Sequence, residues 1–151
     1  MPNYKKHLFA GFITYSSLIF ILNLNTTIFK LIKLLCCCLF GSLFPDIDTK
    51  SKIQKIFYFC ILILYIFLFL KNQNKLITLF SFITLIPIIV NHRGIFHKSW
   101  FVILISITPI IITKLFFPKE LSDTILSCLF FICGAISHIA LDLGIKKVFR
   151  F

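Results

Sequence analysis

The chain has 151 residues, of which 59% are hydrophobic and only 14% are charged, and its mean hydropathy is +1.01. A soluble domain of this length needs far more polar surface, so the composition excludes that class. It predicts one integral membrane domain over residues 1–151. The net charge of +11 is spread between apolar runs. This distribution favours the bilayer and its anionic lipid headgroups as partners and argues against nucleic-acid binding.

Six apolar runs predict an all-α, multi-pass helical membrane bundle. They cover residues 7–29, 31–44, 56–70, 76–90, 99–113 and 124–141. A crossing helix needs about 20 residues, and the second run is short enough to be re-entrant. The first run resembles a signal peptide, but it is too long for one, so we interpret it as a retained span. Pro109 should kink the fifth helix without ending it, and Ser122 or Asp123 should cap the last helix.

All four histidines and three of the five acidic residues stand at the ends of these runs. If all six runs cross the membrane, an even number of crossings separates these positions, so they meet at one face. Imidazole and carboxylate groups are ligands of zinc and manganese, and ionisable groups at a membrane edge are costly unless they serve a function. The pattern therefore predicts a divalent-metal site at one membrane face. Its candidate ligands are His7, Asp46, Asp48, His92, His97, His138 and Asp142.

The spacing within each motif supports this interpretation, and each motif also has a plainer one. His138 and Asp142 are four residues apart, so both project from one helix face. They could bind one ion or simply brace the bundle. Asp46 and Asp48 could bind metal or form a solvated turn. A single short loop carries His92, Arg93 and His97, and its arginine could hold a phosphate or a carboxylate.

The same count of crossings predicts the orientation of the chain. Of the 16 basic residues, ten fall on the side of the candidate ligands and six on the other. Because Lys and Arg are enriched on the cytoplasmic face, the site and both termini are expected in the cytoplasm, in a multi-pass protein of the inner membrane. The ten are Lys5, Lys6, Lys50, Lys52, Lys55, Arg93, Lys98, Lys146, Lys147 and Arg150; the six are Lys30, Lys33, Lys71, Lys75, Lys114 and Lys119.

Four motifs, taken in order, are similar to those of a known family. They are His7-x-x-x-Gly11, Leu43-Phe-Pro-Asp-Ile-Asp48, His92-Arg-Gly-Ile-Phe-His97 and Gly134-x-x-x-His138-x-x-x-Asp142. Over nearly the whole chain this order resembles the YdjM-like family of bacterial inner-membrane proteins, which implies a metal-dependent hydrolase. The last motif is more distantly similar to the His-x-x-x-Asp helix that supplies zinc ligands in zinc-dependent phospholipases C. The chain differs from similar proteins at Thr49, Lys50 and Phe96 and in its short C-terminal segment.

The sequence thus predicts a membrane-bound hydrolase that uses zinc or, as the next choice, manganese. Asp46, Asp48 or Asp142 would act as the general base, and Arg93 would stabilise an anionic transition state. A phosphoester of a small molecule or a lipid suits this basic site. Two other classes stay open: a small metal or proton transporter, and a non-enzymatic membrane scaffold. A transport site usually lies near the bilayer midplane, and the predicted loops offer a soluble partner little surface.

Overall fold

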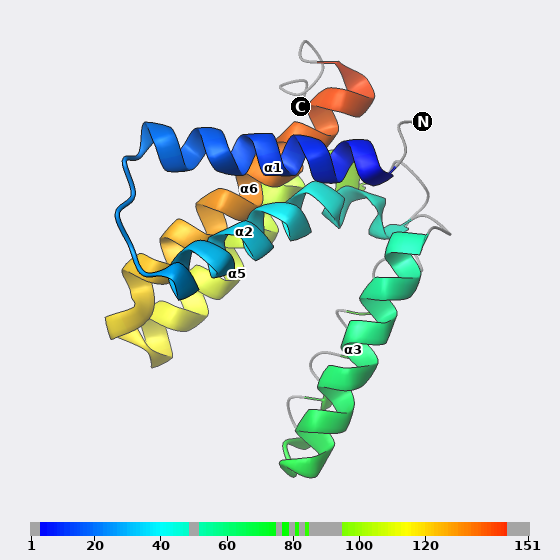
Figure 1. Cartoon of the computed structure of the whole chain (residues 1–151). Coiled ribbons are helices and arrows are strands. Elements are labelled where there is room, and N and C mark those ends of the chain that lie inside the picture. Colours follow the sequence, from blue (N-terminus) through cyan, green and yellow to red (C-terminus); the bar gives the residue numbers. More distant parts are fainter. Residues whose placement is uncertain are drawn as a thin grey trace. The chain divides into compact units, whose positions relative to one another are not determined.

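The computed structural model describes residues 4–48, 52–74, 77–78, 81, 84 and 95–144, whose regular structure is entirely helical (Figure 1). The helices are α1 (Tyr4–Ile21), α2 (Ile28–Leu43), α3 (Lys52–Leu70), α5 (Ser99–Phe116) and α6 (Leu121–Leu143), with 3-10 turns η1 (Phe44–Asp48), η2 (Ile95–His97) and η3 (Pro118–Glu120). Among the described residues, four stretches are long and apolar enough to cross a membrane: Ile28–Ile47, Lys52–Leu70, Ser99–Phe116 and Pro118–Asp142. The all-α membrane class is confirmed, and the count of six crossings stays a prediction.

The chain divides into two compact units. The first comprises Met1–Pro45 and Phe96–Phe151, and the second comprises Asp46–Ile95. In the second unit, the Tyr58 hydroxyl donates to the carbonyl oxygen of Thr84 at 3.1 Å, and the Tyr65 hydroxyl lies 3.1 Å from the Thr84 side-chain oxygen. Both tyrosines belong to α3, so Thr84 packs against that helix. Most of the predicted fourth run, residues 76–90, lies outside the described residues.

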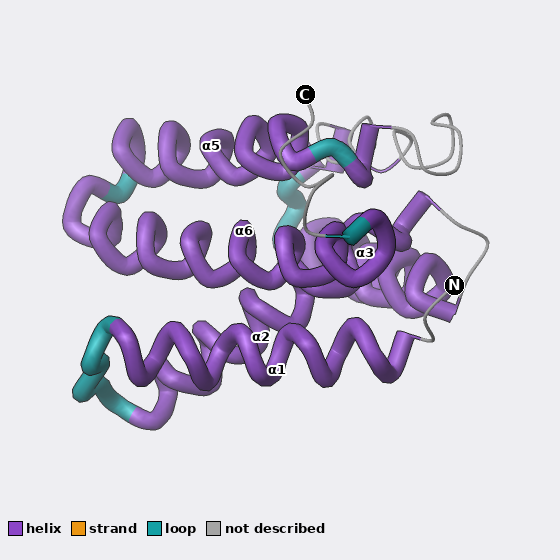
Figure 2. Tube along the Cα trace, turned by 90° about the horizontal axis from the view of Figure 1, so that it is seen from above, coloured by secondary structure: helices purple, strands orange, loops and turns teal. Residues whose placement is uncertain are grey.

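The first unit contains α1, α2, α5 and α6, and α6 contacts each of the other three. Figure 2 shows α5 and α1 on opposite sides of α6. Two contacts fix the direction of α2 relative to α6. Lys30 near the start of α2 pairs with Asp123 near the start of α6, at 2.9 Å. Ser42 near the end of α2 contacts His138 near the end of α6. The two helices are therefore parallel, and α2 runs along most of the length of α6.

Glycines allow α2 and α6 to cross at backbone contact. A Cβ atom added at Gly41 would lie 2.1 Å from the carbonyl oxygen of Phe131, and one added at Gly134 would lie 2.1 Å from the carbonyl oxygen of Cys38. Real Cβ atoms essentially never approach another atom so closely. Association of helices in lipid depends on such close packing of small residues, because lipid tails remove the hydrophobic driving force. The crossing fixes the register of α2 on α6.

The boundary between the first two helices differs from the prediction. The apolar run 7–29 was expected to be one helix, but α1 ends at Ile21 and α2 begins at Ile28. Asn23 has a φ of 46°, and the amides of Asn23 and Leu24 bond to the carbonyl oxygens of Phe20 and Ile19. This pattern is the Schellman motif, in which a left-handed residue closes a helix. Asparagine tolerates that conformation better than other non-glycine residues, and hydropathy does not detect it.

The start of α6 also differs from the prediction. Glu120 occupies the N-cap position without a side-chain cap bond, so neither Ser122 nor Asp123 caps the helix as expected. Asp123 lies inside α6, where its carboxylate pairs with Lys30 and Lys33 of α2. An acidic side chain in the first turn is still favourable because the helix dipole is positive there. Pro109 lies within α5 and does not end it, as expected.

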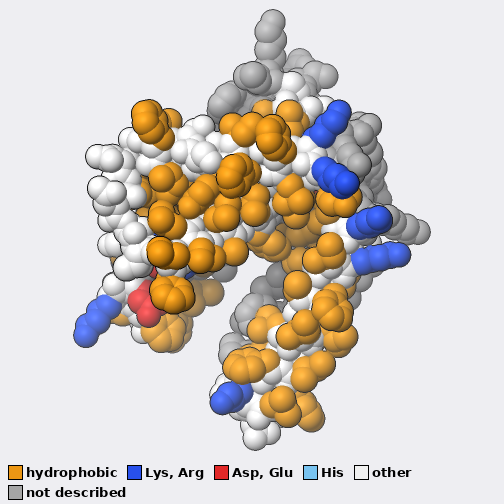
Figure 3. All heavy atoms as spheres, in the orientation of Figure 1, with side chains coloured by type: hydrophobic (Ala, Val, Ile, Leu, Met, Phe, Trp, Pro, Cys, Tyr) orange, Lys and Arg blue, Asp and Glu red, His pale blue; other side chains and the backbone are white. Residues whose placement is uncertain are grey.

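Apolar side chains cover the outer faces of these helices. Figure 3 shows hydrophobic side chains along the sides of the helices and basic ones near their ends. Phe20 and Phe29 are 87% and 86% exposed, and several other large apolar residues are more than half exposed. In water such a surface would be an aggregation hazard, whereas in a bilayer it faces lipid tails. This surface confirms the membrane environment that the composition predicted.

Candidate metal centre

His138 is a fully buried candidate ligand, and its ring is oriented by a contact with α2. Its side chain is 0% exposed, and its Nδ1 lies 2.7 Å from the backbone carbonyl oxygen of Ser42. A carbonyl oxygen can only accept, so Nδ1 carries the hydrogen of this bond. In the neutral ring, Nε2 is then left with the lone pair. Ligating histidines are commonly oriented by such a bond from their second nitrogen.

Asp142 lies one helical turn beyond His138, with its carboxylate between imidazole nitrogens. The His138 Nε2 atom is 3.6 Å from Oδ2 of Asp142. The Asp142 side chain is only 2% exposed and stands next to the last residue of α6. Burial disfavours a carboxylate anion, and the negative end of the helix dipole disfavours it further. A positive partner at this position would offset both effects.

His7 approaches the same carboxylate from α1. Its Nε2 atom is 3.5 Å from Oδ1 of Asp142, and its side chain is 1% exposed. The ring stacks on that of His138, with centroids 3.8 Å apart and an angle of 17° between planes. One turn further along α1, a Cβ at Gly11 would lie 2.6 Å from the Ser42 Oγ atom. The absence of a side chain at Gly11 therefore brings α1 against α2 and places His7 over His138.

His97 comes from the turn η2, directly before α5. Its Nε2 atom lies 3.6 Å from Oδ2 of Asp142, and its side chain is 4% exposed. The preceding residue, Phe96, is 2% exposed and packs against Phe44 and Phe101, with ring centroids 5.5 Å and 5.1 Å apart. This aromatic contact anchors the turn on both sides. The ring of His97 meets that of His138 edge-on at 5.6 Å.

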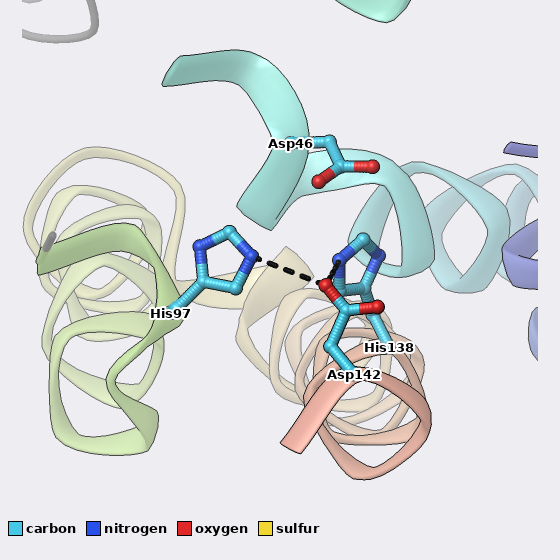
Figure 4. Close-up of side chains that lie close together, drawn as sticks. All are labelled: Asp46, His97, His138 and Asp142. Carbon is cyan, nitrogen blue, oxygen red and sulfur yellow. Dashed lines mark ion pairs between the residues drawn. The ribbon is translucent and has the colours of Figure 1, made fainter. Parts of the chain in front are cut away.

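The distances fit the donor set of a divalent metal ion. Donor atoms from His97, His138 and Asp142 all lie within 4.8 Å of one another (Figure 4). In a tetrahedral site with bonds of about 2.0–2.1 Å, neighbouring donor atoms lie about 3.3–3.4 Å apart. The three histidine–carboxylate distances of 3.5, 3.6 and 3.6 Å are close to this spacing. They are longer than the 2.7–2.9 Å typical of a direct charge-assisted hydrogen bond. This His/Asp group could therefore hold a metal ion.

The first unit brings four of the seven predicted ligands together from two helices and a turn. They are His7, His97, His138 and Asp142. Asp46, also labelled in Figure 4, is the first residue of the second unit and follows Pro45 directly within η1. Among the remaining candidates, His92 and Arg93 lie outside the described residues, as does the side chain of Asp48.

The group lies at one end of the first unit, and an ion-pair cluster lies at the other. Asp123 and Asp142 are both on α6, 19 positions apart, which corresponds to about 28 Å along a helix. The hydrocarbon core of a bilayer is about 30 Å thick. Asp123 pairs with Lys30 and Lys33, while Asp142 is surrounded by histidines. The length of α6 is therefore sufficient for the two polar clusters to stand near opposite faces of a membrane.

Sequence reasoning did not identify Ser42 as a site residue. Its side chain is fully buried, and it acts on His138 through its backbone carbonyl. A backbone acceptor leaves no signature in residue type. The only available signal was the small size of Gly11, Gly41 and Gly134, which stand near Ser42 on three helices. Gly11 and Gly134 each lie four residues from a histidine, His7 and His138, and this spacing could have predicted close helix contacts beside them.

These features define a helical membrane protein with a buried His/Asp group at one end of its bundle. The chain belongs to the YdjM inner membrane protein family, because the sequence model of that family matches residues 1–147. This match confirms the family resemblance of the four motifs and the membrane location. No curated protein and no solved structure matches the chain.

Proposed function

We propose that this protein is a divalent-metal-dependent hydrolase with its site at one face of the membrane. The observation that carries the proposal is the buried Asp142 carboxylate, with nitrogen atoms of three histidines 3.5–3.6 Å from its oxygens. Imidazole and carboxylate together suit zinc best and manganese next. Buried ionisable groups at membrane depth are costly, and metal binding is a function that would retain them.

The proposed ligand set is centred on His97, His138 and Asp142, with His7 beside them. We include Asp46 as a further carboxylate donor. It stands four residues after Ser42, on the turn η1. The first residue of this turn, Phe44, packs its ring against that of Phe96 in the first unit. Asp48 and His92 remain proposed ligands on the grounds of their sequence motifs.

In the proposed reaction, the metal ion and the side chains of the protein have different roles. A divalent ion would act as a Lewis acid on a phosphoryl oxygen and would make water more acidic. Asp142 is held between three imidazoles, so its role is to bind and orient. Asp46 or Asp48 is then the better general base, because both lie on the short turn η1, directly after the packed ring of Phe44. Arg93 would stabilise the negative charge of the transition state.

The substrate class follows from the surroundings of the site. A phosphoester, of a small molecule or a lipid headgroup, carries the negative charge that a basic membrane face attracts. The balance of ten to six basic residues favours a cytoplasmic site and cytoplasmic termini in the inner membrane. A substrate would then reach the site from the cytoplasm or from the inner leaflet.

A matched pair of substitutions on α6 tests the proposal. Asp142→Asn and Asp123→Asn make the same chemical change at opposite ends of one helix. The protein is purified in detergent, loaded with zinc or manganese, and analysed for bound metal by mass spectrometry. Hydrolysis of bis(p-nitrophenyl) phosphate is measured on the same samples. Asp142→Asn should weaken metal binding by about 10- to 100-fold or more and abolish hydrolysis, because its carboxylate orients or binds the ion. Asp123→Asn should retain both.

His138→Ala separates metal binding from folding. It should remove bound metal while the helical content, measured by circular dichroism, stays near that of the wild type. Equal metal content in the wild type and His138→Ala, at equal folded fraction, would rule out the metal centre. Metal binding without hydrolysis of phosphodiester or phosphomonoester probes would contradict the hydrolase and favour the transporter.

A further inference from the structure

A groove separate from the His/Asp group lies between α2, α5 and α6. Its volume is about 510 Å³, within the range of small-molecule sites. Its wall is mainly apolar and includes Ile105 and Pro109 of α5 and Phe131 of α6, with Lys33 of α2 at one end. All three helices are candidate membrane spans, so the surroundings of the groove are lipid tails.

On α6 the groove lies in the half of the helix away from the His/Asp group, and on α2 its lining extends from Lys33 to Phe40 and on to Phe44. Along α6 it extends from Phe131 to Thr124, and these residues precede Asp142 by 11 and 18 positions. At 1.5 Å per residue, the groove lies about 16–27 Å from Asp142 along the helix axis. The midplane of a hydrocarbon core lies about 15 Å from either face. The groove on α6 therefore lies in the half of the membrane near Lys33 and Asp123.

The hydroxyl groups along the groove make their hydrogen bonds within the protein. Ser106 donates to the carbonyl oxygen of Val102 at 2.7 Å, and Ser127 donates to the carbonyl oxygen of Asp123 at 2.8 Å. Thr124 donates to the Thr113 hydroxyl at 3.3 Å. Because these donors are used internally, the wall presents an apolar surface to a ligand. Such a wall fits an acyl chain and gives a polar molecule little to bind.

The end of the groove carries an excess of positive charge. Lys30 and Lys33 share the single carboxylate of Asp123, and their side chains are 34% and 49% exposed. One negative charge cannot neutralise two lysines, so one positive charge stays available to an anion at this face. Basic pockets between membrane helices are known to bind acidic lipid headgroups.

We propose that this groove binds one anionic glycerophospholipid of the leaflet opposite the metal centre. Its phosphate would lie at Lys30 and Lys33, and one acyl chain would extend along the groove towards Phe131. The charge at the mouth, the apolar wall and the depth of the groove all fit this ligand. The site is independent of the proposed hydrolase, because none of its residues belongs to the His/Asp group.

Native mass spectrometry of the full chain tests the proposal. The detergent-solubilised protein is titrated with dioleoyl phosphatidylglycerol and, separately, with dioleoyl phosphatidylcholine. The wild type should bind one phosphatidylglycerol about fivefold more tightly than phosphatidylcholine, as expected for one net positive charge near the phosphate. A triple variant, Lys30→Gln, Lys33→Gln and Asp123→Asn, removes the charges without leaving a lone carboxylate. It should lose this preference. Lys71→Gln at the end of α3 changes the net charge by the same amount and should keep it.

Two single substitutions test the two halves of the site. Asp123→Asn removes the competing carboxylate and should tighten phosphatidylglycerol binding several-fold. Ile105→Trp narrows the groove and should weaken binding of both lipids by about tenfold or more, with thermal unfolding by circular dichroism confirming that the variant is folded. Equal binding of the two lipids by the wild type would overturn the proposal. So would an unchanged preference in the triple variant, or unchanged affinity in a folded Ile105→Trp variant.

Discussion

Replacing Gly134 by alanine should disturb the proposed metal centre, although Gly134 lies one helical turn before His138. The new Cβ would lie 2.1 Å from the carbonyl oxygen of Cys38 and 3.0 Å from the backbone nitrogen of Ser42. These neighbours are backbone atoms and cannot turn aside. Ordinary contact begins near 3.4 Å, so α2 and α6 would have to separate by about 1.3 Å. Ser42 and His138 lie on these two helices, one turn beyond the clash.

The separation can be converted into an expected effect on the site. If α2 moves as a rigid helix, the 2.7 Å bond from His138 Nδ1 to the Ser42 carbonyl oxygen opens to about 4 Å, beyond hydrogen-bond distance. Overpacking costs about 1–3 kcal/mol, and the lost bond costs about 0.5–1.5 kcal/mol. Alanine gains about 1 kcal/mol of helix propensity over glycine. The clash outweighs this gain, so we expect a net loss of about 1–3 kcal/mol.

Two measurements separate the effect on stability from the effect on the site. Thermal unfolding can be followed by the fluorescence of Trp100, the only tryptophan. Metal affinity, measured by competition with a chromogenic chelator, should fall about 10- to 100-fold because His138 loses its orienting bond. Leu141→Ala, at a 48% exposed position of the same helix, serves as the control and should change neither quantity strongly. Wild-type metal affinity in a folded Gly134→Ala variant would refute the coupling between the crossing and the site.

Three further outcomes are expected. A chelator should lower the unfolding temperature of the wild type and leave that of His138→Ala unchanged, since saturating metal at about 100 times Kd stabilises by about 2.7 kcal/mol; equal shifts would contradict the metal centre. Ser42→Ala should keep metal affinity within about threefold, because Ser42 bonds to His138 through its backbone carbonyl, which alanine retains; a large loss would show that the hydroxyl matters. Reporter fusions at Phe151 should be active only in the cytoplasm, and periplasmic activity would reverse the predicted orientation.

The sequence was most informative where polar residues interrupted apolar runs. His7, His138 and Asp142 could be selected because an ionisable group beside a membrane span is costly and so demands a reason. Helix periodicity placed His138 and Asp142 on one face. The membrane class followed from composition, and the all-α class followed from the length of the apolar runs. These inferences depend on residue type and local spacing, which a sequence contains directly.

Features that depend on contacts between distant residues could not be predicted in this way. Asp123 was expected to act locally, as a cap for α6, but it pairs with Lys30 and Lys33, about 90 positions away in the sequence. The end of α1 depends on the left-handed conformation of Asn23, inside a run whose hydropathy continues to Phe29. In both cases the deciding interaction involves a backbone conformation or a partner on another helix. Neither hydropathy nor residue spacing reports a backbone conformation or a partner on another helix.

The packing of the first unit explains why a metal centre would lie at a bundle end and not at its middle. Lipid tails provide no hydrophobic force that holds helices together, so α2 and α6 associate through the glycine crossing. A crossing fixes the separation and register of two helices most tightly near the contact itself. Gly134 and Gly41 stand within two turns of His138 and Ser42, respectively, so ligand positions there are tightly constrained. In the proposed arrangement the same location lies at the membrane face, where water and a phosphoester could enter. A site at the bilayer midplane could hold its ligands as rigidly, but water and a phosphoester could not reach it.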